Sequence, residues 1–202
     1  MAQHPWSELI ATWFGEALDD PASIKDRMAW WFGSDPKRDD ELRESFSSLL
    51  ADCAAGQNYR WQEHPEGRLA MVIALDQLPR NLFRGSPEAF AHDASTAALC
   101  LAAAATGEDL KLLPIQRAFL YMPLQHFEDL AAQEAGVALY RKLAEDTPNQ
   151  AHFREGFLPF AIQHRDIVAQ FGRFPHRNET LGRTSTPEEE AYLAAGAPRF
   201  GQ

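Results

Sequence analysis

The sequence predicts an all-α protein, and three observations support this: the composition, the residues at the helix ends and the spacing of apolar residues. The 202 residues include 32 Ala and 22 Leu but only 3 Val and 6 Ile. Ala and Leu favour helices, whereas β-branched residues favour strands, so a parallel sheet with buried Val- and Ile-rich strands is strongly disfavoured. We therefore predict a single helical domain over residues 1–202, built from stacked antiparallel helical hairpins with short connections.

Helix starts are marked by prolines that follow a capping side chain. The pattern occurs at Asp20-Pro21, Asp35-Pro36, Ser86-Pro87 and Thr186-Pro187. A capping side chain accepts a hydrogen bond from the first turn, and proline suits the first helical position. Glu189 completes a capping box with Thr186, and glycines suit the C-terminal ends of the helices. These limits predict about nine helices, over residues 5–14, 21–32, 36–55, 66–78, 87–106, 114–121, 124–145, 149–171 and 187–195.

In chain order, the predicted helices differ in their apolar faces. The first two, which end at Gly15 and Gly33, belong to a region that holds all five tryptophans, and we expect these to anchor the first hairpins. The helix at 36–55 carries one apolar stripe, formed by Leu42, Phe46, Leu49, Leu50 and Cys53. The helix at 66–78 is apolar on all sides between Leu69 and Leu75, which predicts a central position. Residues 94–105 are mostly Ala and Leu, so a neighbouring helix can approach them closely.

The charge and the cysteines limit the class of protein. The net charge is −10, and both nucleic-acid binding and membrane-surface binding are typical of basic proteins, so we expect neither partner. No apolar run reaches the roughly 18 residues of a membrane span, and no signal peptide is visible. Cys53 and Cys100 lie on apolar helical patterns and are predicted to be small buried residues rather than a disulfide framework. We expect a cytoplasmic location.

Polar side chains occupy apolar stripes on three of the predicted helices. His164 continues a stripe of Phe153, Phe157 and Phe160 at steps of four and three residues, which Ile167 and Phe171 extend. His126 and Gln133 share a stripe with Leu130 and Val137, and Asp76 and Arg80 follow Leu69 and Ile73. Burying such groups unpaired costs about 1–3 kcal/mol each, so they should pair with one another or with a ligand. One interpretation is a core network that fixes the helix register, and the other is a functional site.

The segment from 171 to 186 concentrates positive charge in an acidic chain. From Arg165 to Arg183 there are four Arg, two acids and one His. Arg suits the bidentate recognition of carboxylate or phosphate, and the segment leads into a helix N-terminus, which favours anions. We predict an anion site whose ligand-binding residues are Arg80, Arg173, Arg177, Asn178 and Arg183. The alternative is that these arginines pair with acidic residues such as Asp76 and Glu128 on neighbouring helices and fix the loop.

Metal and nucleophile chemistry have little support in the sequence. His126-x-Glu128 and His164-x-Asp166 contain metal-binding residue types, but positions two residues apart on a helix do not face each other. No glycine-rich phosphate loop, nucleophile elbow or paired Cys-x-x-Cys is present. We therefore predict no metal and no cofactor. Histidine titrates near neutral pH, so the candidate proton-transfer residues are His126, His164 and His176, with Asp76 beside them.

Several motifs in the sequence resemble an uncharacterised, mainly bacterial family, the domain of unknown function 924. They are the stretches at 75–84, 119–124, 126–128 and 171–178, followed by Leu181-Gly182-Arg183. The resemblance spans nearly the whole chain and implies a helical fold similar to the tetratricopeptide-like superfold, without implying a reaction. Two positions depart from the family pattern, because Leu78 stands where Phe is usual and Phe127 where Ser is usual.

Two classes of function remain open. The first is a tetratricopeptide-like scaffold with a polar Arg/His pocket that binds a protein or peptide partner or a small anionic ligand. The second is a small-molecule enzyme that acts on a phosphate- or carboxylate-bearing substrate, with His as general acid or base. A scaffold should show an exposed groove on a concave face, whereas an enzyme should gather the polar residues in one enclosed pocket. The ligand and the oligomeric state are not predicted.

Overall fold

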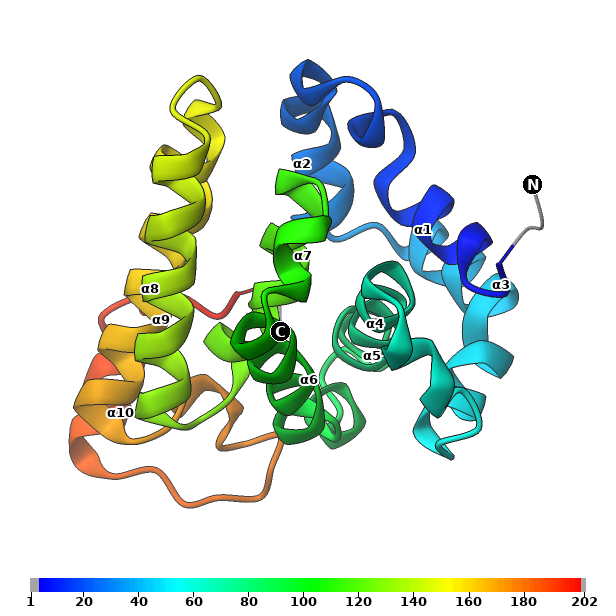
Figure 1. Cartoon of the computed structure of the whole chain (residues 1–202). Helices are drawn as coiled ribbons and strands as arrows, with labels where there is room; N and C mark the ends of the chain where they lie inside the picture. Colours follow the sequence, from blue (N-terminus) through cyan, green and yellow to red (C-terminus); the bar gives the residue numbers. More distant parts are fainter. Residues whose placement is uncertain (1–3, 201–202) are drawn as a thin grey trace.

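The protein is all-α over residues 4–200, which are the residues described by the computed structural model (Figure 1). The α-helical segments are α1 Ser7–Phe14, α2 Ile24–Phe32, α3 Pro36–Ala54, α4 Pro65–Val72, α5 Leu78–Leu82, α6 Asp93–Thr106, α7 Pro114–His126, α8 Leu130–Asp146, α9 Leu158–Phe171 and α10 Pro187–Ala194. A π-helical turn, Ile73–Gln77, joins α4 and α5 into one continuous helix, so the described chain has nine helices and no strand. The predicted fold class is confirmed.

Most of the predicted helix starts carry the expected caps. Asp20 accepts a hydrogen bond from the amide of Ala22, and Asp35 accepts one from the amide of Lys37. Thr186 and Glu189 form the predicted capping box. Ser86 differs, because its hydroxyl bonds the Glu88 carboxylate and not a backbone amide. Local capping chemistry therefore sets these boundaries, with one exception.

Several predicted helix limits near prolines are wrong. The helix predicted over 87–106 begins at Asp93 instead, because Pro87–Phe90 forms a separate 3-10 helix. The helix predicted to end at residue 78 continues through Pro79 to Leu82, and α7 continues through Pro123 to His126. The helix predicted to start at 124 starts at Leu130 instead, capped by Asp129. A proline ring normally clashes with the carbonyl four residues earlier, but a wider π turn relieves this clash. The π turns Ile73–Gln77 and Phe153–Phe157 each end two residues before a proline.

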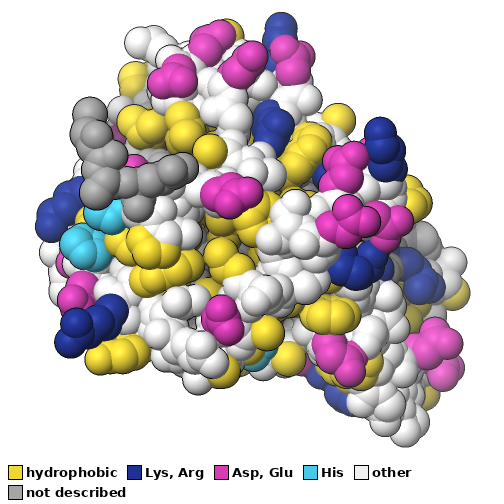
Figure 2. All heavy atoms as spheres, turned by 90° about the vertical axis from the view of Figure 1, so that its right-hand side faces the viewer, with side chains coloured by type: hydrophobic (Ala, Val, Ile, Leu, Met, Phe, Trp, Pro, Cys, Tyr) yellow, Lys and Arg dark blue, Asp and Glu magenta, His cyan; other side chains and the backbone are white. Residues whose placement is uncertain are grey.

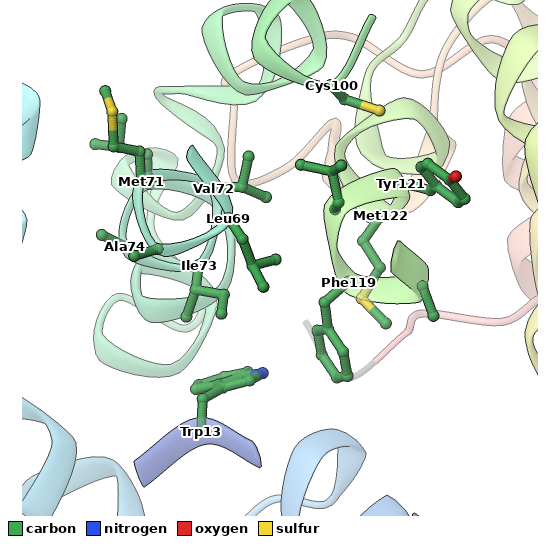
Figure 3. Close-up of a cluster of buried hydrophobic side chains, with 14 of the residues drawn as sticks. Trp13, Leu69, Met71, Val72, Ile73, Ala74, Cys100, Phe119, Tyr121 and Met122 are labelled. Atoms are coloured by element: carbon green, nitrogen blue, oxygen red, sulfur yellow. The ribbon is translucent and has the colours of Figure 1, made fainter. Parts of the chain in front are cut away.

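The main core forms where the α4 helix packs against α7, and Trp13 of α1 closes one side (Figure 3). Leu69, Ile73 and Phe119 are fully buried, as are most of their neighbours. Every residue of α7 from Ile115 to Gln125 is buried, so α7 is as central as the predicted helix around Leu69. A second, smaller cluster is formed by Ile167 and Val168 of α9 and by Phe174 of the loop after α9. The core therefore fixes α4, α5 and α7 in place.

The remaining helices surround this centre. Figure 1 shows α8 and α9 side by side at one edge, with α10 below them, α1 and α3 at the other edge, and α2 above α7 near the middle. Figure 2 views the second edge and shows Asp and Glu side chains spread over it, as the net charge of −10 leads one to expect. Cys53 and Cys100 are free and buried. Among residues 4–200 no helix is long and apolar enough to cross a membrane.

Candidate functional site

A cavity of about 580 Å³ lies between α2, α5, α7 and α9. Its apolar wall is formed by Met28, Ala29, Trp31, Phe32, Met122, Phe157, Phe160 and Phe200, and its polar wall by Gln77, Arg80, Asn81, Arg84, Gln125, His126 and His164, with the backbone of Gly33 between them. Each π turn contributes one residue to the wall, Gln77 and Phe157. An apolar cavity of this size with a few convergent polar groups is typical of small-molecule sites. π turns within α-helices also occur frequently at functional sites.

Asp76 and His126 form a buried pair at the cavity wall. The Nδ1 atom of His126 lies 2.8 Å and 3.0 Å from the two carboxylate oxygens of Asp76, which is fully buried. Burial alone would raise the pKa of Asp76, but the charge of Arg80 and the contact with His126 outweigh it and hold this pKa well below its ordinary value. Since an ionised carboxylate only accepts hydrogen bonds, His126 Nδ1 carries the proton. His126 Nε2 then presents its lone pair on the opposite side of the ring.

Burial also keeps the His126 imidazole neutral. It lowers the pKa of His126 below its ordinary value, and Arg80 acts in the same direction, while Asp76 opposes them. His126 Nε2 makes no hydrogen bond with the described residues. Many enzymes use this arrangement for a general base. A carboxylate fixes the tautomer of a neutral imidazole and leaves its Nε2 atom available.

His164 is a second neutral histidine at the same cavity. Its ring centre lies 6.1 Å from that of His126, and burial lowers its pKa to about 3. The expectation that His164 is buried is confirmed. Its Nδ1 does not pair with one of the other predicted polar groups, because it donates to the carbonyl of Phe160 in the same helix, 2.7 Å away. Helical side chains lean toward the preceding turn, where a carbonyl oxygen keeps a second lone pair.

Arg80 connects the Asp76–His126 pair to the loop that follows α9. Its Nη1 lies 3.1 Å from Asp76 Oδ1, and its Nη2 donates to Asp93 Oδ1 at 2.7 Å. Arg177 donates to the other oxygen of Asp93 at 2.9 Å, and its guanidinium lies 4.4 Å from the ring centres of Phe90 and Phe174. Burial lowers the pKa of Arg177 to about 10, although Asp93 opposes this shift. Two arginines and two carboxylates thus alternate along a buried chain.

Arg84 lies on the same wall, one helical turn beyond Arg80. Its Nε donates to Asp39 at 2.8 Å, and its Nη2 donates to Asn81 at 2.9 Å. Asp39 also accepts from Arg38, which is buried. Asp39 and Asp76 themselves do not line the cavity, so the ionised groups on its wall are guanidinium groups. Both guanidinium groups are paired with carboxylates that lie behind the wall.

The other predicted ligand-binding residues form ion pairs away from the cavity. Arg173 donates to both carboxylate oxygens of Glu189 at 2.7 and 2.8 Å, and Arg183 donates to both of Glu128 at 2.5 and 2.9 Å. Asn178 is buried and bonds Ser185, Glu189 and Arg183. His176 lies in the same loop, where burial and Arg177 lower its pKa to about 3. None of these residues, nor Arg177, lines the cavity.

The structure therefore brings together part of the predicted site. Arg80, His126 and His164 line one cavity with Asp76 directly behind them, while Arg173, Arg177, Asn178, Arg183 and His176 hold the 171–186 loop against neighbouring helices. Sequence reasoning missed Gln77, Asn81 and Arg84 as wall residues, although their spacing from Arg80 continues one helical face. It also missed the wall residues Gln125 and Phe200. Gln125 is buried, and its side-chain oxygen has no hydrogen-bond partner among residues 4–200.

The available donors suit an organic ligand better than a metal ion. Among residues 4–200, no group of three His, Cys, Asp or Glu side chains is placed to hold a metal ion. The cavity wall offers amide groups, guanidinium groups and two imidazole lone pairs. Such a set can bind an anionic group and transfer a proton.

Comparisons with known proteins agree with the family resemblance in the sequence. A solved structure of a protein of unknown function from Agrobacterium tumefaciens is similar to this chain, with 34% sequence identity and a TM-score of 0.73. The similarity covers 88% of this chain and 100% of that one. A search of curated proteins finds no match. The family model described as bacterial protein of unknown function, domain 924, matches residues 9–197, and the chain therefore belongs to this family.

Proposed function

We propose that the cavity binds a small molecule with an apolar body and one carboxylate or phosphate group, and that His126 serves as a general base toward it. The observation that carries this proposal is the Asp76–His126 pair at the polar wall of a cavity of about 580 Å³, with Arg80 and Arg84 on the same wall. Of the two function classes that the sequence leaves open, a cavity that gathers these polar residues supports the small-molecule enzyme.

The apolar wall supports a ligand with an aromatic or aliphatic body. Trp31, Phe32, Phe157 and Phe160 are aromatic residues of the cavity lining. Burying each Å² of apolar ligand surface contributes about 25 cal/mol, so aromatic walls favour apolar bodies over hydrated ones. Phe32 and Phe160 are 49% and 53% exposed, which places them at the opening of the cavity.

The polar wall supports an anionic group and a proton-transfer step. Arg80 and Arg84 supply positive charge, and Gln77, Asn81 and Gln125 supply amide hydrogen bonds. Neutral His126 can accept a proton at Nε2, and Asp76 stabilises the imidazolium that forms. The described wall residues include no Ser, Thr, Cys, Lys or Tyr, so a covalent intermediate on such a side chain is not part of the proposal. His164 offers a second neutral imidazole about 6 Å away.

A thermal-shift and calorimetric titration with four probes tests this proposal. Phenylphosphate and benzoate combine both features, whereas inorganic phosphate lacks the apolar body and benzyl alcohol lacks the charge. We expect the first two to raise the melting temperature at constant ionic strength, by the equivalent of about 2.7 kcal/mol at one hundred times Kd, and the other two to do so less at equal concentration. The His126 imidazole resonances should shift only with the two combined probes.

Two tryptophan variants show whether binding occurs in the cavity. Ala29 lies on α2 at the cavity, and Ala29→Trp should fill the space and abolish the stabilisation by phenylphosphate. Ala51 is an exposed helical alanine outside the cavity, so Ala51→Trp is the matched control and should bind as the wild type does. Equal binding by both variants would place the ligand elsewhere and contradict the proposal.

A further inference from the structure

The residues after α10 return across the molecule to the cavity. Figure 1 shows this segment, in red, running from α10 at one edge to the neighbourhood of α7 in the middle. Its Phe200 is part of the cavity wall. The Phe200 ring stacks on the His164 imidazole, with a distance of 3.8 Å between ring centres and 28° between ring planes. The segment thus closes the cavity on the side where His164 lies.

The segment is held by side-chain packing and not by backbone hydrogen bonds. Gly196 donates to the carbonyl of Leu193, but residues 197–200 make no hydrogen bond with the rest of the described chain. Phe200 packs against the small cluster of Ile167, Val168 and Phe174, which is separate from the main core. Segments with few buried contacts and no hydrogen bonds open at low cost. Detaching residues 196–200 would therefore leave the main core intact.

The backbone of Phe200 is also strained. Its φ angle is +51°, and it is the one residue other than glycine with a positive φ among residues 4–200. Bulky side chains disfavour this region because the Cβ atom crowds the backbone. Such strain persists only where surrounding contacts enforce it, and at this position the enforcing contacts are the rings of His164, Phe174 and His176. Release of these contacts relieves the strain and favours opening.

We propose that residues 196–200 form a strap that covers and uncovers the His164 side of the cavity, with Phe200 as the residue that seals this side. In the closed state Phe200 keeps water from His164. In the open state the face of His164 becomes accessible to a ligand. The strap regulates access to the site proposed above. Only the identity of the ligand rests on the proposed function.

Chemical modification of His164 tests the strap without any ligand. Diethyl pyrocarbonate acylates neutral imidazole nitrogens, and peptide mapping by mass spectrometry resolves His164 from the other histidines. We expect Phe200→Ala to increase the rate of His164 modification at least tenfold. Phe200→Tyr keeps a stacking ring and should react at the wild-type rate, which distinguishes loss of the ring from a disturbed fold.

The control for a general loss of packing is Phe83→Ala. Phe83 is 38% exposed and does not line the cavity, so this substitution should leave the His164 rate unchanged. Circular dichroism of all three variants should match the wild type. Equal His164 rates in the wild type and Phe200→Ala would overturn the strap, as would an increase in Phe83→Ala of the same size.

Binding kinetics with phenylphosphate test whether the strap must open for entry. For the wild type we expect the observed binding rate to level off at high phenylphosphate concentration, because strap opening becomes limiting. For Phe200→Ala the rate should rise linearly over the same range. A linear rise in both proteins would contradict gating by the strap. If phenylphosphate binds neither protein, the proposed function fails, while the modification rates still decide whether the strap exists.

Discussion

His164 loses its ability to hold a proton because the fold removes it from water. The residue is 6% exposed, and burial lowers its pKa from 6.5 to about 3, with Arg177 and the nearby His126 acting in the same direction. Its Nδ1–H donates to a backbone carbonyl, which partly opposes the shift. At neutral pH His164 is therefore an uncharged hydrogen-bonding group in an aromatic setting.

This burial makes stability depend on pH. Below pH 6.5 the unfolded chain binds a proton at His164 that the folded chain does not bind. The contribution of neutral His164 to the unfolding free energy is therefore complete above pH 6.5 and decreases as the pH falls toward 3. Between pH 7 and pH 5 the loss in unfolding free energy should be about 2 kcal/mol from this group. Urea unfolding of the wild type and His164→Gln at both pH values measures it. Identical losses in the two proteins would contradict the assignment.

Substitution by alanine at two glycines, Gly67 and Gly156, should have opposite effects on stability. A Cβ atom on Gly67 would lie 2.3 Å from the carbonyl oxygen of Trp61, whereas a Cβ on Gly156 would have no atom within 4 Å. Gly67→Ala should destabilise the protein by about 1–3 kcal/mol, because backbone must move. Gly156→Ala should stabilise it by about 0.4–1 kcal/mol, since the unfolded chain loses freedom. Urea unfolding measures both, and equal effects would contradict the local geometry.

Individual site residues could be predicted only where helical spacing revealed them. Asp76, Arg80, His126 and His164 stand on apolar stripes, and a stripe is visible in the sequence. Phe200 has no such signal, because it follows the last helix and reaches the cavity through tertiary packing. The arginines of the 171–186 loop were conspicuous by charge, but charge alone does not distinguish a ligand from the Glu and Asp partners found here.

Among the helices, the N-terminal caps could be predicted from the sequence, but the continuation of a helix through a proline could not. The side chains of Asp20, Asp35 and Thr186 act locally, so their caps follow from sequence. Pro79 and Pro159 lie inside helices because a π turn precedes each, where the amide of the residue before the proline bonds a carbonyl five residues back. Both Asp76 and Gln77 belong to the first π turn, where Asp76 is fully buried and Gln77 lines the cavity. A helix that ended before Pro79 would not place Asn81 and Arg84 on the cavity wall, whereas the observed helix continues to Leu82.

The ion pair between Arg183 and Glu128 ties the loop after α9 to the connection between α7 and α8. It is bidentate, and both side chains are mostly buried, with exposures of 24% and 21%. A double-mutant cycle with Arg183→Met and Glu128→Gln should give a coupling energy of about 1–2 kcal/mol. The pair Arg154–Glu155 is 58% and 66% exposed and serves as the control, with expected coupling below about 0.5 kcal/mol. Equal coupling in the two pairs would show that the loop is held by other contacts.

The whole molecule is expected to unfold as one unit, which tests the predicted single domain. One apolar cluster contains residues from α1 to α9, and the smaller cluster under α9 is joined to it by the pairs Arg177–Asp93 and Arg183–Glu128. Calorimetry should therefore show one transition, with a van't Hoff enthalpy equal to the calorimetric one. At about 0.7 kcal/mol per residue near 60 °C, the enthalpy should be about 140 kcal/mol.

The same pairs indicate where this cooperativity would fail first. Arg177 is buried between Phe90 and Phe174, so Arg177→Ala removes both an ion pair and ring contacts between the α9 loop and the rest of the molecule. This variant should broaden or split the calorimetric transition, whereas the exposed Arg154→Ala should not. Two transitions already present in the wild type would contradict the single domain. A sharp single transition in Arg177→Ala would instead show that apolar packing alone couples the two clusters.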